Sequence, residues 1–301
     1  MQQSLPRIQF TKRSFSSVFT GENDPRLAYV SKIPPELEQI QYRVMHAHQE
    51  LVEILLIDSG SSEILLGDKK YTIQPGDLLI YNPGVVHDEA AWRKNRVGHY
   101  CAGISGLHMP GLRENALIAE DQSRVFPAGD SFGELRALFE LMFNALAEEE
   151  PQAEQFCHHL ARALLVRVLS VMGGAKTAPV EPPDILGKRI QDYIDAHYTE
   201  ALTLQSMGDA LHVSPYYLSH VFKKTLGYSP MQYLLRRRIG EAQTLLLTTR
   251  LPVGQIAEMV GYDTQSYFNL QFTKQIGMAP GRYRQEFAPP ETGGGKSGGQ
   301  R

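Results

Sequence analysis

The sequence has little cysteine, a single tryptophan and no long apolar run. Its two cysteines, Cys101 and Cys157, lack the CxxC spacing of a redox or zinc motif, so we expect buried or reduced thiols and no disulfide framework. No apolar run approaches the roughly 18 residues that span a bilayer, which argues against a membrane protein. The N-terminus, MQQSLPRIQF, lacks the basic start and apolar core of a secretory signal, so the expected location is cytoplasmic.

The charges are divided unevenly along the chain. A chain of 301 residues with 42% hydrophobic and 21% charged residues is typical of a globular protein with two domains. Residues 185–287 contain 11 Lys and Arg against 8 Asp and Glu, a net charge of +3, whereas residues 1–184 contain 17 against 24, a net charge of −7. A basic part joined to an acidic one is the asymmetry expected of a nucleic-acid-binding module appended to a separate domain.

Residues 51–104 alternate short apolar runs with turn signals, which predicts an all-β region. Pro75-Gly76 and Pro83-Gly84 fit type II turns, because proline presets φ at the second turn position and glycine accepts the positive φ at the third. Regular short strands of this kind favour a barrel or a sandwich.

Two amphipathic helices are predicted after Ser131. The first places its apolar residues on one face: Phe132, Leu135, Leu138, Phe139 and Met142. The second has an apolar row at helical spacing: Phe156, Leu160, Leu164 and Val168. Both helices could pack on their own barrel, or they could form a dimer seam. The second helix is apolar over more than one stripe, which favours a homodimer.

Composition marks the domain boundaries. Residues 173–184, GGAKTAPVEPPD, have glycines, three prolines and no apolar periodicity, and are predicted to be a linker. The linker separates a first domain, residues 1–172, from a second, residues 185–287. Residues 288–301 cannot bury a core and are predicted to be disordered.

The last hundred residues contain an internal repeat with an offset of 50 residues. Residues 213–233 match residues 263–283 at eight positions: Ser214/Thr264, Tyr217/Tyr267, Leu218/Phe268, Phe222/Phe272, Lys224/Lys274, Gly227/Gly277, Pro230/Pro280 and Tyr233/Tyr283. A short apolar-periodic helix precedes each copy, TLQSMGDALH in the first and PVGQIAEMVG in the second. The repeat therefore predicts two helix-turn-helix units.

Capping residues define where the helices of these units begin and end. Ser214 is a good N-cap with Pro215 at the first helical position, and Thr264 is the N-cap of the corresponding helix in the second unit. Gly261 is predicted to close the helix before it. Between the units, a helix of about 18 residues would be about 27 Å long. That length would hold two recognition helices at about the 34 Å separation of successive major grooves.

With this repeat, residues 185–287 resemble the DNA-binding domain of the AraC/XylS family of bacterial transcription regulators, most closely over QIAEMVGYDTQSYFNLQFTKQIGMAPGRYR. The resemblance implies binding of double-stranded DNA through two recognition helices in consecutive major grooves. It implies base contacts from Tyr216, Ser219 and His220 in the first unit and from Gln265, Ser266 and Asn269 in the second, with Ser214 at the start of the first recognition helix. Side-chain amides, hydroxyls and aromatics can all contact base edges.

Five basic residues are predicted to contact phosphates: Lys223, Lys224, Arg236, Arg237 and Lys274. Two residues depart from the family pattern. Gly208 stands where alanine is usual, and we expect it to loosen its helix by roughly 0.5–1 kcal/mol. Leu270 stands where a polar residue is common, so the second unit either reads fewer bases or contacts a thymine methyl through Leu270.

The first domain resembles a cupin barrel. His46-Ala-His48 followed by Glu53 and Gly60 is similar to the first cupin motif, and PGDLLIYNPGVVH, ending at His87, is similar to the second. In regulators of the AraC kind such a barrel implies a small-molecule inducer, by family analogy a sugar. His46, His48, Glu53 and His87 are the predicted ligand-binding residues. Trp92 is predicted either to stack on the sugar or to be a core residue.

The same four residues leave two other roles open. Imidazoles and a carboxylate suit divalent metals, which gives the alternative of a metal-dependent cupin enzyme with a fused DNA-binding module. The histidines could also be paired internally. We expect no cofactor and no enzymatic activity, because barrels of AraC-type regulators often keep these motifs without a metal.

The sequence thus predicts an α+β multidomain protein with an N-terminal cupin-like β barrel, trailing helices and a C-terminal all-α double helix-turn-helix. The implied function is ligand-controlled, sequence-specific regulation of transcription, with activation the commoner outcome in the family. The expected partners are double-stranded DNA, a sugar-like inducer, a second copy of the chain and RNA polymerase.

Overall fold

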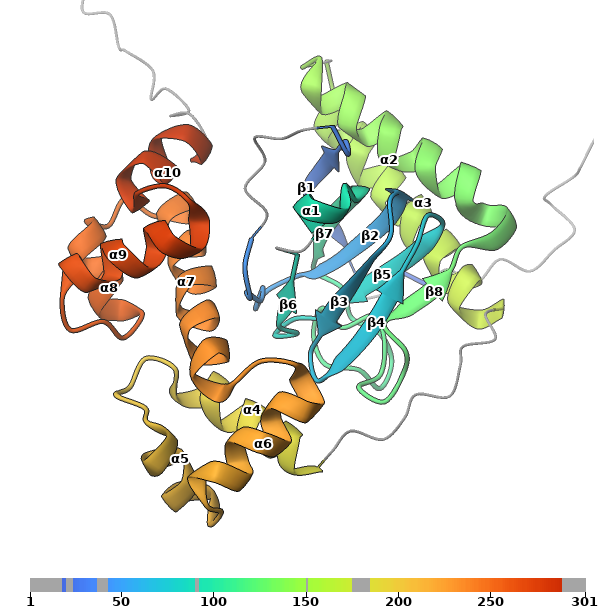
Figure 1. Cartoon of the computed structure of the whole chain (residues 1–301). Coiled ribbons are helices and arrows are strands. Elements are labelled where there is room, and N and C mark those ends of the chain that lie inside the picture. Colours follow the sequence, from blue (N-terminus) through green and yellow to red (C-terminus); the bar gives the residue numbers. More distant parts are fainter. Residues whose placement is uncertain are drawn as a thin grey trace, which may run out of the picture.

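The computed structural model describes residues 18–19, 24–36, 43–89, 92–149, 151–174 and 185–288. Strands occupy the N-terminal half and helices the C-terminal part, which confirms the predicted α+β architecture (Figure 1). Most of the predicted linker and nearly all of the predicted tail, residues 175–184 and 289–301, lie outside the described residues.

Two antiparallel sheets form the N-terminal domain. Their strands are β1 (Arg26–Ile33), β2 (Val52–Ser59), β3 (Ser62–Leu66), β4 (Lys69–Ile73), β5 (Asp77–Tyr81), β6 (His87–Asp88), β7 (Gly98–Ser105) and β8 (Val125–Pro127). One sheet has the order β1-β7-β2-β5-β8 and the other the order β4-β3-β6. The predicted turns are present, because Gly76 and Gly84 have φ values of +92° and +76°, and the i to i+3 hydrogen bonds run from Asp77 N to Gln74 O and from Val85 N to Asn82 O.

The central strand β2 is buried on both faces, which explains its continuous apolar run. Leu55 and Ile57 face the interior between the two sheets, in a core that includes Trp92 of the short helix α1 (Trp92–Asn95). Ile54 and Leu56 face the other way, toward two long helices. Alternation along the strand therefore divides the domain into two cores.

Those helices are α2 (Phe132–Ala147) and α3 (Ala153–Gly174), which follow the short 3-10 helix η2 (Gly129–Ser131) and cover the outer face of the larger sheet (Figure 1). The apolar face predicted for α2 is confirmed in part, since Leu135, Phe139 and Met142 are buried. The apolar row predicted for α3 is also confirmed in part, because Leu164 and Val168 are buried, whereas Phe156 is 43% exposed. Among the described residues, α3 alone is long and apolar enough to cross a membrane, judged by length and composition.

The C-terminal domain is entirely helical. Its helices are α4 (Ile185–His197), α5 (Leu204–Leu211), α6 (Pro215–Leu226), α7 (Pro230–Thr248), α8 (Val253–Met259), α9 (Gln265–Ile276) and α10 (Pro280–Phe287). Helices α5 and α6 form the first helix-turn-helix unit and α8 and α9 the second. The long helix α7 joins them (Figure 1).

The predicted helix ends are confirmed. The hydroxyl of Ser214 accepts a hydrogen bond from Tyr217 N, and the hydroxyl of Thr264 accepts one from Tyr267 N. Gly261 has a φ of +87°, as its place after α8 requires. The two repeated helices, α6 and α9, are both 12 residues long, so the internal repeat of the sequence is a repeat of structure.

Candidate functional site

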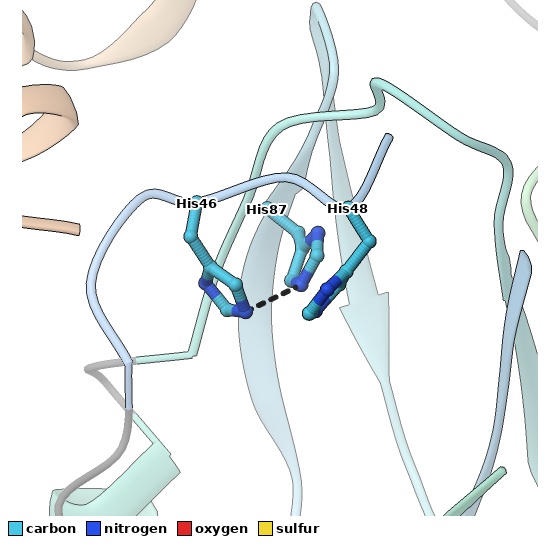
Figure 2. A group of neighbouring side chains, drawn as sticks. All are labelled: His46, His48 and His87. Carbon is cyan, nitrogen blue, oxygen red and sulfur yellow. Dashed lines mark hydrogen bonds between the residues drawn. The ribbon is translucent and has the colours of Figure 1, made fainter. Parts of the chain in front are cut away.

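The four predicted ligand-binding side chains come together at one end of the N-terminal domain. His46 and His48 lie on the segment that precedes β2, Glu53 lies in β2, and His87 begins β6. A β-bridge between His46 and His87 brings the two motifs side by side. Figure 2 shows the three imidazoles turned toward one another, and their ligand atoms all lie within 4.8 Å.

Short distances link the set into one cluster. The Nε2 atoms of His46 and His87 are 3.1 Å apart. His48 Nε2 lies 3.2 Å from Glu53 Oε1, and His87 Nε2 lies 3.3 Å from Glu53 Oε2. His46 and His87 are buried, whereas the His48 side chain is 20% exposed, so His48 lies on the solvent side of the cluster.

The backbone fixes the tautomers of the two buried histidines. His46 Nδ1 lies 3.1 Å from the carbonyl oxygen of Val44, and His87 Nδ1 lies 3.0 Å from that of Val85. A carbonyl oxygen only accepts hydrogen bonds, so both Nδ1 atoms carry the hydrogen and both Nε2 atoms present a lone pair. Burial lowers the pKa of His87 to about 4 and the pKa of His46 well below its usual value, which keeps both rings neutral at pH 7.

Glu53 remains charged despite its burial. Burial alone would raise its pKa, but the hydrogen bond and charge of His48, together with His87 and Tyr29, lower it to about 2. The Tyr29 hydroxyl, from β1, donates a hydrogen bond to Glu53 Oε1. Tyr29 lies outside both sequence motifs, and only the pairing of β1 with β7 brings it to the site.

This donor set fits a divalent cation. Two lone pairs that face each other across 3.1 Å repel unless a cation or a hydrogen-bond donor satisfies them. Two nitrogens that each lie about 2.1 Å from one metal ion are about 3.0–3.4 Å apart, and metal-bound histidines usually donate their other N–H to a carbonyl or carboxylate. The side chains of His46, His48, His87 and Glu53 would hold such a metal, which would supply a positive charge for an anionic or hydroxylated ligand.

The sugar-stacking role of Trp92 requires correction. The Trp92 side chain is completely buried between the sheets and meets His99 edge-on, with 4.9 Å between the ring centroids. An indole without exposed surface cannot stack on a sugar, so Trp92 is a core residue.

The predicted base-reading residues lie on two exposed helix faces. In α6, Tyr216 is 84% exposed and His220 is exposed, and Ser219 is partly buried beside them. In α9, Gln265 and Ser266 are exposed at the first turn. Asn269 is partly buried, and its Oδ1 atom is buried without a hydrogen-bond partner among the described residues.

Three of the five predicted phosphate-contacting residues, Lys223, Lys224 and Lys274, are exposed in the last turns of α6 and α9. The structure does not support this role for the two arginines of α7. The Arg237 side chain is 6% exposed, forms ion pairs with Asp195 and Glu241, and lies over the ring of Tyr198. Arg236 is paired with Asp88 of the N-terminal domain. The sequence does not reveal that α7 packs on both sides, and for this reason the phosphate-contact prediction for these two arginines was wrong.

Gly208 and Leu270, the two residues that depart from the family pattern, lie in different surroundings. Leu270 is 62% exposed on α9, among the predicted base-reading residues. Gly208 was expected to loosen α5, but a Cβ atom there would lie 2.7 Å from the Val213 carbonyl oxygen. The tight turn between α5 and α6 therefore requires the missing side chain.

A buried polar cluster in one domain and a pair of exposed, capped helices in the other define a sensor joined to a DNA-binding module. Comparison with known proteins agrees with this class. Residues 36–165 match the model of the AraC-like ligand binding domain, and residues 207–286 match that of a helix-turn-helix domain. The chain belongs to the AraC family of transcription regulators.

Similar proteins cover most of the chain. The uncharacterised HTH-type transcriptional regulator YijO of Escherichia coli strain K12 is 27% identical over 279 residues, which are 90% of this chain and 93% of that protein. The arabinose operon regulatory protein of the same strain is 25% identical, covering 72% of this chain and 74% of that protein. Among solved structures, the C-terminal domain of AraT from Geobacillus stearothermophilus is 40% identical over 38% of this chain and 95% of that domain, with a TM-score of 0.36.

Proposed function

We propose that the chain is a cytoplasmic transcription activator whose N-terminal domain binds a small, sugar-like inducer at the set formed by His46, His48, Glu53 and His87. The observation that carries this proposal is the convergence of these four side chains within the domain that matches the AraC-like ligand binding model. Inducer binding changes occupancy of promoter DNA by α6 and α9, and activation follows through contact with RNA polymerase.

The chemistry of the set supports a hydroxylated ligand. The Nε2 lone pairs of His46 and His87 and the carboxylate of Glu53 are acceptors, and each hydroxyl of a sugar is a donor. Similarity to the arabinose operon regulatory protein of Escherichia coli, which is named for a sugar, also favours a sugar. The partly exposed His48 is the member of the set that such a ligand would meet first.

A divalent metal at the same set is the second candidate, favoured by the facing Nε2 atoms of His46 and His87. The metal would then be either the signal itself or the anchor for an organic inducer. In a further version of this candidate, the metal serves catalysis, and the chain is a metal-dependent enzyme with an attached DNA-binding module.

One pair of measurements separates the candidates. Metal analysis of the purified chain is combined with a thermal-shift screen of pentoses and hexoses, with and without added Zn²⁺ or Mn²⁺. A sugar that stabilises metal-free protein supports the first candidate. Stoichiometric metal that is lost in His46→Ala and His87→Ala supports the second.

A promoter reporter tests the site in cells. His48→Ala should abolish the response to the inducer and leave the DNA affinity of the unliganded protein nearly unchanged, because the His48 side chain faces Glu53 and His87 inside the N-terminal domain. His108→Ala, at an exposed position of the same domain, is the control. An unchanged induction curve in His48→Ala would show that the inducer binds elsewhere.

We also propose that the chain is a homodimer through α3. The exposed face of this helix is an uncharged stripe with alternating spacings of three and four residues: Phe156, His159, Ala163, Val166 and Ser170. This spacing is that of the a and d positions of a coiled coil. Most of the other apolar residues of this helix, including Leu164, Leu165, Val168 and Val171, are buried, so Phe156 and Val166 are the large apolar side chains that this face offers to a partner copy.

A further inference from the structure

A cleft of about 630 Å³ lies between the N-terminal domain and α4, apart from the histidine cluster. Its volume is typical of a small-molecule site. Among the described residues, none of the four cluster side chains lines this cleft, since Val86 lines it and the next residue, His87, turns to the cluster. The polar side chains of the lining include Lys69, Arg113, Glu120, Arg124, Gln191 and Asp195.

Arg124 is a buried cation whose hydrogen-bond donors are largely unused. Its side chain is 6% exposed, and its Nε and Nη1 atoms are buried without a hydrogen-bond partner among the described residues. Its Nη2 atom lies 3.4 Å from Glu120 Oε2, but the Glu120 side chain is 65% exposed, so solvent weakens this ion pair. A buried guanidinium with unused donors is unfavourable, because it has lost water without gaining partners. An anionic oxygen supplied from the cleft would balance this charge.

Gln191 of α4 has the opposite need, for a hydrogen-bond donor. The residue is 2% exposed, and its Nε2 donates hydrogen bonds to Gly67 O, at 2.9 Å, and to the Tyr233 hydroxyl, at 3.0 Å. These bonds fix the amide, and its Oε1 is buried without a donor among the described residues. Arg124 reaches the same glycine, because a Cβ atom on Gly67 would lie 3.7 Å from the guanidinium carbon. The two unsatisfied side chains therefore meet at Gly67.

The charges around the cleft define the class of ligand. A hydroxyl or an ammonium group could donate to Gln191 Oε1, but Arg124 and Lys188 in the same lining would repel an ammonium group. The lining carries four basic and five acidic side chains, so it tolerates the single negative charge of a carboxylate better than the nearly double charge of a phosphate. The chemistry indicates a carboxylate that also carries hydroxyl groups.

We propose that this cleft is a second small-molecule site of the chain and that it takes a hydroxylated monocarboxylate, such as a sugar acid. Arg124 holds the carboxylate inside the cleft, and Gln191 Oε1 accepts a hydrogen bond from a hydroxyl. Arg113, whose side chain is 52% exposed, attracts the carboxylate at the mouth. The inference needs neither a ligand nor a metal at the histidine cluster, so the two sites can be tested independently.

Isothermal titration calorimetry of the full-length chain tests the inference. The probes are gluconate and glucitol, which share a hydroxylated carbon chain and differ in ending with a carboxylate or with a neutral CH₂OH group. The variants are Arg124→Gln and Arg113→Gln. Arg136→Gln is the control, because Arg136 is a partly exposed, ion-paired arginine of α2 outside the cleft.

We expect gluconate to bind the wild-type chain and glucitol to bind at least about tenfold more weakly. Arg124→Gln should weaken gluconate binding by about tenfold or more, the loss expected for a hydrogen bond to a charged group. Arg113→Gln should weaken it by less, because Arg113 is half exposed, and Arg136→Gln should leave it unchanged. Circular dichroism confirms folding, and if Arg124→Gln does not fold, Arg113→Gln alone decides.

Equal binding of gluconate and glucitol would overturn the inference, because the cleft would then not recognise the carboxylate. Gluconate binding that is absent from the wild-type chain, or unchanged in both cleft variants, would overturn it as well. Gluconate binding that is lost in His48→Ala and retained in Arg124→Gln would place the sugar acid in the histidine cluster. That result would refute the second site and support the proposed inducer site.

Discussion

Neighbouring residues in this protein serve different domains. His87 belongs to the polar cluster of the sensor and Asp88 holds an arginine of the DNA-binding domain. On α9, Asn269 and Lys274 lie on one helix at different depths, the first partly buried and the second exposed. Single substitutions can therefore test separately the roles of residues that lie on the same strand or helix.

Asn269 and Lys274 should differ in what they recognise. Asn269→Ala should cost about 1–3 kcal/mol at the preferred site and relax preference at one base position, because an amide reads a base edge. Lys274→Ala should weaken binding to all sequences alike and lower the salt slope by about one unit, because a lysine meets phosphate. Titrations of wild-type and single-base-changed duplexes at several salt concentrations measure both. Uniform effects from both substitutions would mean that α9 does not read bases through Asn269.

The imidazoles of His87 and His99 should make the metal-free protein less stable in acid, and the buried carboxyl of Glu89, whose pKa burial raises to about 8, should offset part of that loss. Burial lowers the pKa of His87 and of His99 to about 4 in the folded state, so between pH 6.5 and 4 the unfolded chain binds more protons. The stability that the two neutral imidazoles contribute is thus present above pH 6.5. It is lost as the pH falls, by about 2 kcal/mol per imidazole between pH 7 and 5. Urea unfolding at both pH values measures the loss. It should shrink in His99→Gln and stay the same in His220→Gln, which changes an exposed histidine.

Gly208 should resist the usual helix-stabilising substitution. Because a Cβ atom there meets the Val213 carbonyl, Gly208→Ala should lower the free energy of unfolding by about 1–3 kcal/mol, as overpacking does. The exposed control Gly281→Ala should be neutral or slightly stabilising. Thermal unfolding compares the two, and a stabilised Gly208→Ala variant would contradict the tight turn.

At the scale of elements, the two faces of a long helix lie in different surroundings. Helix α7 packs on both helix-turn-helix units and on the sensor, and α3 packs on the sheet while its other face is exposed. An arginine on such a helix is as available for an ion pair as for a phosphate, which is how Arg237 came to be assigned wrongly from the sequence.

The exposed face of α3 should form the dimer. Val166→Glu places a charge in the middle of the uncharged stripe and should convert the dimer into monomers, because a buried unpaired charge is strongly unfavourable. Leu141→Glu, a similarly exposed apolar position on α2, should leave the dimer intact. Analytical ultracentrifugation distinguishes the species. A Val166→Glu variant that remains dimeric would place the interface elsewhere.

At the scale of the whole molecule, the DNA-binding domain should fold alone. Its caps, repeat and apolar faces are complete within residues 185–287, although Val44 and Met45 of the sensor also contribute to its cores. A fragment starting near Pro182 should fold with reduced stability. It should bind a duplex that the full-length chain selects from a random pool more weakly than that dimeric chain does, because it offers one module instead of two. Circular dichroism and fluorescence anisotropy test this, and an unfolded fragment would refute the domain assignment.

The sequence by itself determined every feature that depends on local pattern. The alternation of apolar residues, the capping residues and the offset-50 repeat established the α+β architecture, the helix ends and the two helix-turn-helix units, because these follow from backbone preferences within a few residues. The two cupin-like motifs identified His46, His48, Glu53 and His87 as members of one cluster. The order of these residues along the chain reflects the order in which the strands pair.

Only the tertiary structure decided the features that depend on contacts between distant segments. It placed Trp92 in a core, committed Arg236 and Arg237 to acidic partners, brought Tyr29 to Glu53, and set Gly240 against the backbone of Met45. Whether a side chain is exposed, paired or closely approached depends on both of the segments that meet in the fold. A sequence pattern describes one segment at a time, so these partners could not be predicted from it.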